Sequence, residues 1–215
     1  MSIDHDHEPD HAHSHAGSAT MAARVNALVS RLEAKGIVTE AAIEAAVNTF
    51  LANARPSNGA ALVARAWVDP AFASRLLADA NAALNELGID MTHWAPVKLR
   101  AVANAEHLHN VIVCTLCSCY PVALLGPSPS WYKSAAYRAR VVREPRAVLA
   151  EFGVELEAET HIQVWDSTAE LRYVVVPRRP AGTEGWSESA LAGLITRDAL
   201  VGTAIVSPPT RSAST

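Results

Sequence analysis

The sequence predicts an α+β protein in which a helical N-terminal arm precedes a mixed globular domain. Residues 20–87 are rich in alanine and carry apolar residues at helical spacing. After Gly88 the pattern changes to short apolar or alternating runs that are typical of strands, such as 111–113. The chain has 215 residues, which suffices for one domain with an extension or for two small domains.

The composition is that of a soluble globular protein, since 50% of the residues are hydrophobic and 19% are charged. No run of apolar residues is long enough for a transmembrane helix, so we expect no membrane partner. The net charge of −4 argues against nucleic acid as the main partner. The acidic, histidine-rich N-terminus lacks the basic start and apolar run of a secretory signal, and we expect a cytoplasmic protein.

Residues 1–18 are predicted to form a disordered tail. The segment contains five of the nine histidines, namely His5, His7, His11, His13 and His15. No apolar residue recurs there at a regular spacing, so the segment cannot bury enough surface to offset its ordering entropy. An alternative is a metal-gathering arm, because neutral imidazoles bind divalent first-row ions.

Residues 19–88 are predicted to form the helical arm, which begins with two helices. The first carries an apolar stripe that includes Leu28 and Leu32, and it ends at Gly36. Thr39 is a suitable N-cap for the second helix, because its hydroxyl can accept a hydrogen bond from the first turn.

A third, long helix is expected to complete the arm. The segment 56–59 combines Pro, Ser, Asn and Gly and is predicted to form a turn. Asp69 and Pro70 match the N-cap and the first position of a helix, and Gly88 matches the residue that closes it.

Residues 89–206 are predicted to form the globular domain. Strands are expected at 97–101, 111–113, 161–165 and 171–176, with a turn at 166–168. Helices are expected at 131–142, at 145–153 and after Ser187, which is a suitable N-cap. Residues 207–215 contain adjacent prolines and several Ser and Thr residues, and they are predicted to be disordered.

Three arginines near the expected helix 131–142 have an ordinary structural explanation. Arg138, Arg140 and Arg143 are expected to pair with Glu144, Glu151 or solvent rather than to act in catalysis. Exposed ion pairs of this kind contribute little to stability.

The three cysteines are the strongest chemical signal in the sequence. They lie at positions 114, 117 and 119, in the pattern C-x-x-C-x-C. An odd number of cysteines within one turn cannot join distant segments, so a disulfide scaffold is excluded. A structural zinc site or an iron–sulfur cluster needs four ligands as a rule, and here His107 or His109 would have to supply the fourth.

A different geometry accounts for three closely spaced thiols. The sulfurs of Cys117 and Cys119 can lie on one side of a tight turn, with the main-chain nitrogens of Ser118 and Cys119 between them. If both amides lose their protons, these four atoms surround an ion in one plane, and Cys114 can bind it axially. Amide deprotonation requires a strongly Lewis-acidic ion such as cobalt(III) or iron(III), and the sixth position stays open for chemistry.

Residues 114–119, Cys-Thr-Leu-Cys-Ser-Cys, resemble the metal-binding claw of the nitrile hydratase α subunit. Further matches to that family are Trp131-Tyr132-Lys133, the segment 137–144, Val164-Trp165-Asp166-Ser167, Leu171-Arg172-Tyr173 and the segment 180–187. The resemblance runs from about Asn58 to Gly202 and is strongest from Asn110 onward. It therefore covers most of the chain rather than one short motif.

The resemblance implies a fold and a metal centre. The fold would be a helical arm followed by a layered α/β/β/α domain. One low-spin cobalt(III) ion per chain would be bound by the sulfurs of Cys114, Cys117 and Cys119 and by the main-chain nitrogens of Ser118 and Cys119. Cys117 would be oxidised to the sulfinic acid and Cys119 to the sulfenic acid, which are steps of the usual thiol oxidation ladder.

The resemblance also implies which ion binds. The cobalt-type pattern has Thr between the first two cysteines, where the iron-type pattern has Ser. Thr115, followed by Tyr120, therefore favours cobalt over iron.

The implied activity is the hydration of a nitrile to the amide, a lyase reaction. The ion would polarise the nitrile as a Lewis acid. The implied catalytic residues are Cys119, whose sulfenate oxygen would be the nucleophile or base, and Ser118, whose hydroxyl would hydrogen-bond at the site. A hydroxide at the metal is the alternative nucleophile.

The family also implies partners. Arginines of a β subunit would pair with the oxidised sulfurs, so the chain would be active only with that subunit, as a heterodimer or heterotetramer. A cobalt-delivery activator protein is a further expected partner, and the substrate would be a small nitrile.

Departures from the family pattern leave other activities open. After Tyr120-Pro121, the family has an aromatic residue and a second proline, where this chain has Val122 and Ala123. The altered loop permits an unusual nitrile or a sister activity, of which the metal-bearing subunit of thiocyanate hydrolase is the nearest example. A cobalt carrier or a structural zinc protein is the non-enzymatic alternative.

Overall fold

The computed structural model describes residues 12–89 and 97–208 of the chain, and the side chains from residue 19 onward. The chain divides into two compact units, Met1–Phe50 and Leu51–Thr215. Within the described ranges, no helix has both the length and the apolar character that crossing a membrane requires.

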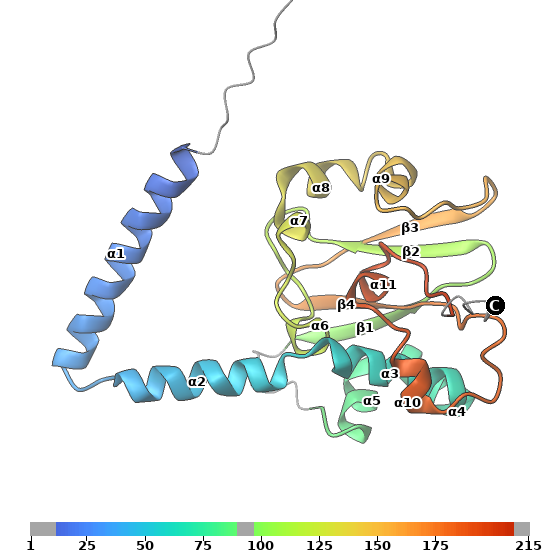
Figure 1. Cartoon of the computed structure of the whole chain (residues 1–215), viewed down its shortest axis with the longest axis horizontal. Helices are drawn as coiled ribbons and strands as arrows, with labels where there is room; N and C mark the ends of the chain where they lie inside the picture. Colours follow the sequence, from blue (N-terminus) through green and yellow to red (C-terminus); the bar gives the residue numbers. More distant parts are fainter. Residues whose placement is uncertain (1–11, 90–96, 209–215) are drawn as a thin grey trace, which may run out of the picture. The chain divides into compact units, whose positions relative to one another are not determined.

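From residue 12 onward, the first unit consists of the two helices that the sequence predicts (Figure 1). Helix α1 spans Ala12–Ala34, and α2 spans Glu40–Asn53 and so ends just inside the second unit. Gly36 has a φ of 66°, which allows the chain to leave α1 in the left-handed conformation. The hydroxyl of Thr39 accepts a hydrogen bond from the N–H of Ala42 at 3.1 Å, which confirms Thr39 as the N-cap.

The expected tail overlaps the start of α1. Helix α1 begins at Ala12, so the last seven residues of the segment 1–18 have helical backbone. This stretch contains Ala12 and Ala16, and alanine is the strongest helix former. His5, His7 and His11 lie outside the described residues, as does most of the segment 207–215 that is predicted to be disordered.

Helix α3 spans Pro56–Val68 and begins where the sequence predicts a turn. The prediction of a turn at 56–59 is wrong, because Pro56 occupies the first helical position, where its missing N–H costs nothing. Leu62 and Val63 on α3 are fully buried. The helix is therefore part of the core.

The predicted third helix is present as two shorter helices, α4 (Pro70–Ala78) and α5 (Ala80–Glu86). Asp69 caps α4 as predicted, accepting from the N–H three residues later at 3.0 Å. Asp79 does the same for α5 at 3.0 Å and so separates the two helices. Gly88 follows α5 with a φ of 68°, as a residue that closes a helix should.

The boundary of the arm also differs from the predicted one at residue 88. Contacts divide the chain at Phe50, because α4 and α5 pack against β1, and α3 packs against α4, α6 and α10. Phe72, Leu76 and Leu84 are almost completely buried in this packing. Amphipathic helices of this kind gain stability from the apolar face they bury, which places them in the globular unit.

In the part of the chain that the structure describes, four strands form two parallel pairs (Figure 1). Strand β1 (Lys98–Ala103) pairs with β4 (Leu171–Val176), and β2 (Leu108–Val113) pairs with β3 (His161–Asp166). The turn expected at 166–168 therefore connects two strands that belong to different sheets, and these strands do not form a hairpin. Sequence spacing alone gave no sign of this pairing.

The remaining helices lie on both sides of the strands. They are α6 (Val122–Leu125), α7 (Ser130–Lys133), α8 (Ala135–Arg140), α9 (Pro145–Glu151), α10 (Glu188–Ala192) and α11 (Arg197–Val201). Figure 1 shows α8 and α9 beside the β2–β3 pair, with α3, α4, α5 and α10 beyond the β1–β4 pair. Ser187 caps α10 as predicted, whereas the expected helix 131–142 is interrupted at Ser134, which caps α8.

Candidate metal centre

The three cysteines lie on one loop, residues 114–119, which follows β2 and is called the cysteine loop below. Cys114 Sγ lies 3.4 Å from Cys117 Sγ, and Cys117 Sγ lies 3.2 Å from Cys119 Sγ. All three sulfurs fall within 4.8 Å of one another, and none is in a disulfide. The structure therefore brings together the three side chains that the sequence singles out, and their role as ligands stays a prediction.

The thiols differ in acidity. Hydrogen bonds from Cys119 and Cys114 lower the pKa of Cys117 to about 7. Burial raises the pKa of Cys119 to about 12, with the shared hydrogen bond to Cys117 adding to the effect and the charge of Arg172 opposing it. A thiolate is the metal-binding form of cysteine, so Cys117 is the first of these two to be ready for a metal. Metal binding would displace the remaining proton.

Strand pairing explains what holds the first half of the cysteine loop. The register places Val113 beside Asp166, so the residues after β2 meet the carboxyl end of β3. The Asp166 carboxylate accepts hydrogen bonds from the Thr115 N–H at 2.9 Å and from the Thr115 hydroxyl at 2.6 Å. Arg138 on α8 donates to the Thr115 carbonyl at 3.2 Å. Thr115 is therefore held from two elements that are distant in sequence.

Three tyrosines lie beneath the loop. The Tyr132 hydroxyl donates to the Cys119 carbonyl at 2.9 Å, and the Tyr137 hydroxyl donates to the Ile112 carbonyl at 2.7 Å. Tyr120 packs edge-on against Tyr132, with ring centroids 4.8 Å apart. Burial raises the pKa of all three phenols, which keeps their hydroxyls protonated and able to donate.

The outer side of the loop is open. Leu116 is 89% exposed and Cys117 is exposed, whereas Cys114 is buried. The chain by itself does not enclose the site.

His107 and His109, which precede the loop in the sequence, do not join the cysteines. His109 is buried, and its Nε2–H donates to the Gly202 carbonyl at 2.7 Å, while its Nδ1 lies 3.4 Å from the amide nitrogen of Asn104. Burial lowers the pKa of His109, which favours the neutral ring. Among the described residues, the cluster suited to a metal contains the cysteines alone, so a fourth ligand from His107 or His109 is not supported.

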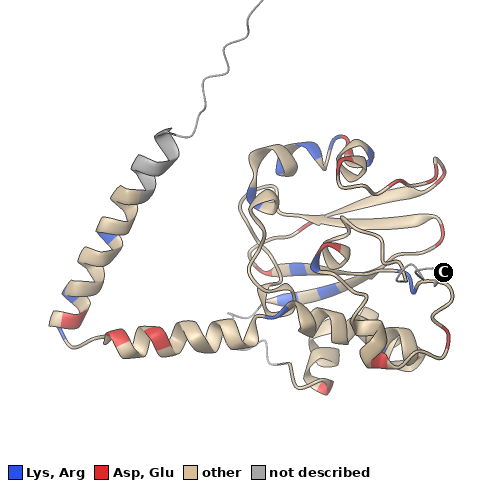
Figure 2. Cartoon of the chain, in the orientation of Figure 1, with Lys and Arg blue, Asp and Glu red and all other residues tan. Residues whose placement is uncertain are grey.

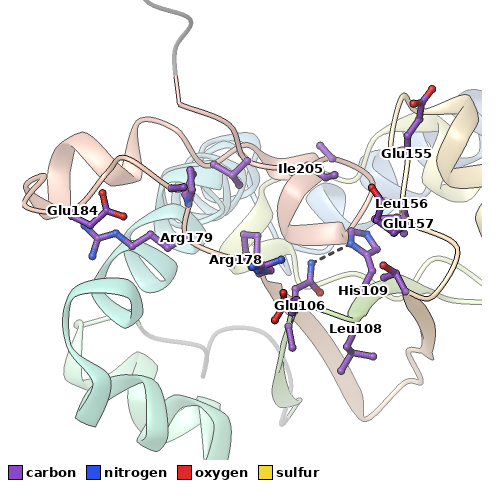
Figure 3. A pocket seen from close by; sticks show the side chains of 18 residues that line it. Glu106, Leu108, His109, Glu155, Leu156, Glu157, Arg178, Arg179, Glu184 and Ile205 are labelled. Carbon is purple, nitrogen blue, oxygen red and sulfur yellow. Dashed lines mark hydrogen bonds between the residues drawn. The ribbon is translucent and has the colours of Figure 1, made fainter.

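His109 instead borders a cavity of about 560 Å³ at the opposite end of β2 (Figure 3). Its charged lining includes Glu106, Glu155, Glu157 and Arg178. None of the cysteines lines this cavity, so it is separate from the candidate metal centre.

The arginines near α8 divide into two groups. Arg140 pairs with Glu144 and with Glu151, each at 2.6 Å, which confirms the structural explanation for this residue; Figure 2 shows the charges near α8 and α9. Arg143 donates instead to a main-chain carbonyl, at 3.1 Å. Arg138 touches the cysteine loop rather than a carboxylate, which the sequence did not predict.

Sequence reasoning also missed Asp166 and Tyr132 as residues of the site. Both lie within segments that match the family pattern, but their contacts with the loop depend on the register of β2 and β3 and on the packing of α7. The only signal in the sequence was their place in those segments.

The fold and the loop define a class of protein: an α+β chain that brings three free thiols together on an incompletely enclosed surface, where they could hold a metal ion. The family model described as nitrile hydratase, alpha chain, matches residues 19–204. The chain belongs to this family.

Curated relatives are similar along most of the chain. The low-molecular weight cobalt-containing nitrile hydratase subunit alpha of Rhodococcus rhodochrous is 45% identical over 206 residues, covering 96% of this chain and 99% of that protein. The cobalt-containing nitrile hydratase subunit alpha of Pseudonocardia thermophila is 48% identical over 183 residues, covering 85% and 89%. The thiocyanate hydrolase subunit gamma of Thiobacillus thioparus is 45% identical over 162 residues, covering 71% and 67%.

Solved structures agree with the fold. A double mutant of the Fe-type nitrile hydratase from Comamonas testosteroni Ni1 matches with a TM-score of 0.82 at 43% identity, covering 89% of this chain and 92% of that one. A recombinant thiocyanate hydrolase with partially modified cobalt centres matches with a TM-score of 0.80 at 37% identity, covering 91% and 97%. The predicted family, fold class and enzyme class, a hydro-lyase of the nitrile hydratase kind, are confirmed.

Proposed function

We propose that this chain is the metal-bearing α subunit of an enzyme that hydrates a small nitrile to the amide. The observation that carries the proposal is the convergence of three free thiols within 4.8 Å on the cysteine loop. Two relatives with this family assignment are named as cobalt-containing nitrile hydratase subunits, which supports cobalt as the ion. A neighbour of the Fe type makes iron the alternative ion.

The donor set suits a thiophilic ion. Three sulfurs that are not in disulfides lie close together, and the lowered pKa of Cys117 favours the thiolate that such an ion requires. The proposed ligands are Cys114, Cys117 and Cys119 through sulfur, with the main-chain nitrogens of Ser118 and Cys119. When bound, a trivalent ion would supply Lewis acidity toward the nitrile nitrogen.

The residues of the loop have distinct proposed roles. Hydration forms a bond between the oxygen of water and the nitrile carbon and moves the protons of water to nitrogen. Cys119, oxidised to the sulfenic acid, is proposed to act as nucleophile or base, and Cys117 is proposed to be the sulfinic acid. The Ser118 hydroxyl is proposed to hydrogen-bond at the site. Asp166 and Arg138 hold Thr115 and so limit the movement of the loop.

A partner subunit is proposed to bury the exposed side of the cysteine loop. Leu116 and Cys117 are exposed on the cysteine loop. Helix α2, considered by itself, has no buried residue among those described. Val47 and Leu51 on α2 are about half exposed, at 49% and 51%. Apolar surface of this kind is typical of an interface. We therefore propose an obligate β subunit in a heterodimer or heterotetramer, a cobalt-delivery activator protein, and the cytoplasm as the location.

Thiocyanate hydrolysis is the second candidate activity. The observation that favours it is the similarity to the thiocyanate hydrolase subunit gamma. This protein and the Rhodococcus rhodochrous relative are both 45% identical to this chain over the aligned residues. A cobalt carrier or a structural zinc protein is the non-enzymatic alternative.

The test is an assay of the complex of this chain with its partner subunit. Aliphatic and aromatic nitriles and thiocyanate are offered to the wild type and to Cys119→Ala, and the metal content of both is measured. We expect amide from at least one nitrile in the wild type, with both activity and metal content strongly reduced in Cys119→Ala. Turnover of thiocyanate alone would assign the second activity, and zinc without turnover would assign the non-enzymatic alternative.

A further inference from the structure

The cysteine loop depends on side chains for its shape. Among the described residues, the main chain of 114–119 makes no backbone–backbone hydrogen bond. Asp166 and Arg138 hold the loop at Thr115, near its start. Near its end, the Tyr132 hydroxyl holds the loop by donating a hydrogen bond to the Cys119 carbonyl at 2.9 Å.

Tyr132 is well placed to fix this end. Its side chain is fully buried, and its ring packs against those of Tyr120 and Trp131, with centroids 4.8 Å and 5.9 Å away. A ring packed in this way has one orientation, so its hydroxyl is a fixed donor. The Cys119 carbonyl is accordingly held at one point, which limits rotation of the main chain that carries the Cys119 sulfur.

We propose that Tyr132 is a positioning residue of the metal centre, because its hydroxyl orients Cys119 through the Cys119 carbonyl. Loss of the hydroxyl leaves the ring and its packing in place but frees the end of the loop. The three sulfurs then sample a wider range of separations before any metal binds. The proposal deepens the proposed function, since the cysteines that Tyr132 orders are the proposed ligands.

Tyr137 provides a matched control. Its hydroxyl is also buried and also donates to a main-chain carbonyl, that of Ile112, at 2.7 Å. Ile112 lies inside β2, however, where pairing with β3 already fixes the main chain. Tyr137→Phe and Tyr132→Phe therefore remove the same group from the same aromatic cluster, but only Tyr132→Phe releases the cysteine loop.

The experiment uses the full-length chain co-expressed with its partner subunit. In complexes prepared without cobalt, the rate of alkylation of Cys119 by iodoacetamide is followed by peptide mass spectrometry. In cobalt-loaded complexes, the position of the sulfur-to-cobalt charge-transfer absorption is recorded. We expect Tyr132→Phe to raise the alkylation rate roughly fivefold, the ratio that corresponds to the typical net contribution of one hydrogen bond, and to shift the absorption. Tyr137→Phe should change neither.

The proposal is overturned if Tyr132→Phe leaves the alkylation rate unchanged, or if both variants raise it equally, since equal effects would mean general loosening. If Tyr132→Phe does not accumulate, 3-fluorotyrosine at position 132 keeps the ring and strengthens the donor, and it should slow the alkylation; an unchanged rate counts against the proposal. A complex that binds no cobalt would contradict the proposed function, while the alkylation rates of metal-free protein would still decide the role of Tyr132.

Discussion

The contact between Asp166 and Thr115 allows a quantitative test of how β3 holds the cysteine loop. Asp166→Ala removes two hydrogen bonds, of 2.9 Å and 2.6 Å. Both lie at an exposed site, so each is taken at about 0.5–1 kcal/mol, which is below the range typical of a charged acceptor. The expected loss is about 1–2 kcal/mol of unfolding free energy, or a decrease of roughly 2–8 °C in Tm for a chain of this length.

The assay is thermal unfolding of the metal-free complex at one fixed protein concentration, because association makes Tm concentration-dependent. Thr115→Val removes the hydroxyl and keeps the branched shape. If the hydroxyl and the carboxylate are coupled, Thr115→Val costs roughly 0.5–1 kcal/mol less in the Asp166→Ala background than alone. Glu159→Ala removes the carboxylate of an exposed residue that makes no side-chain hydrogen bond or ion pair in the described ranges, and is the control.

The reasoning would be refuted if Asp166→Ala and Glu159→Ala changed Tm by the same amount. Strict additivity of Asp166→Ala and Thr115→Val would also contradict it, because two residues that share a hydrogen bond should not act independently.

Three further predictions concern the scaffold around the site. Thr196 is the N-cap of α11, and its hydroxyl accepts a hydrogen bond from the Ala199 N–H at 3.2 Å. Thr196→Ala should therefore lower the free energy of unfolding by about 1 kcal/mol, measured through Tm, whereas Thr196→Ser should lower it less. Burial lowers the pKa of His109, so below its unfolded pKa of about 6.5 the unfolded chain takes up a proton that the folded chain does not, and stability should fall as the pH falls toward the folded pKa. Between pH 7 and pH 5 the Tm of the wild type should therefore fall more steeply than that of His109→Gln; equal slopes would argue against a buried neutral ring. Gly202→Ala would place a Cβ 2.0 Å from the Asn110 carbonyl oxygen at a φ of 93° and should cost at least about 2 kcal/mol by Tm, more than Gly88→Ala, where φ is 68° and no atom lies within 4 Å.

Features that depend on neighbouring residues could be predicted from the sequence. Thr39, Asp69 and Ser187 were recognised as N-caps because a cap acts on the N–H two or three residues later. The clustering of the cysteines was predictable for the same reason, since a spacing of two or three residues limits how far apart the sulfurs can lie. Local chemistry sets these features, and the structure agrees.

Features that depend on distant residues could not be predicted in this way. Nothing in the spacing of 161–166 and 171–176 shows that the two strands belong to different sheets. The contact of Asp166 with Thr115 follows from the parallel register of β2 and β3, and that of Tyr132 with Cys119 follows from the packing of α7. The separation of α7 from α8 at Ser134 was missed because a serine cap was read as part of a continuous helix.

The central claim is that the cysteine loop binds cobalt through its three sulfurs and two main-chain nitrogens. X-ray absorption at the metal edge of the purified complex tests it most directly, because the edge identifies the ion and the first shell counts its ligands. We predict cobalt with three sulfur neighbours and two nitrogen neighbours. A zinc edge with a four-ligand tetrahedral shell, or a cobalt shell that includes histidine, would contradict the account.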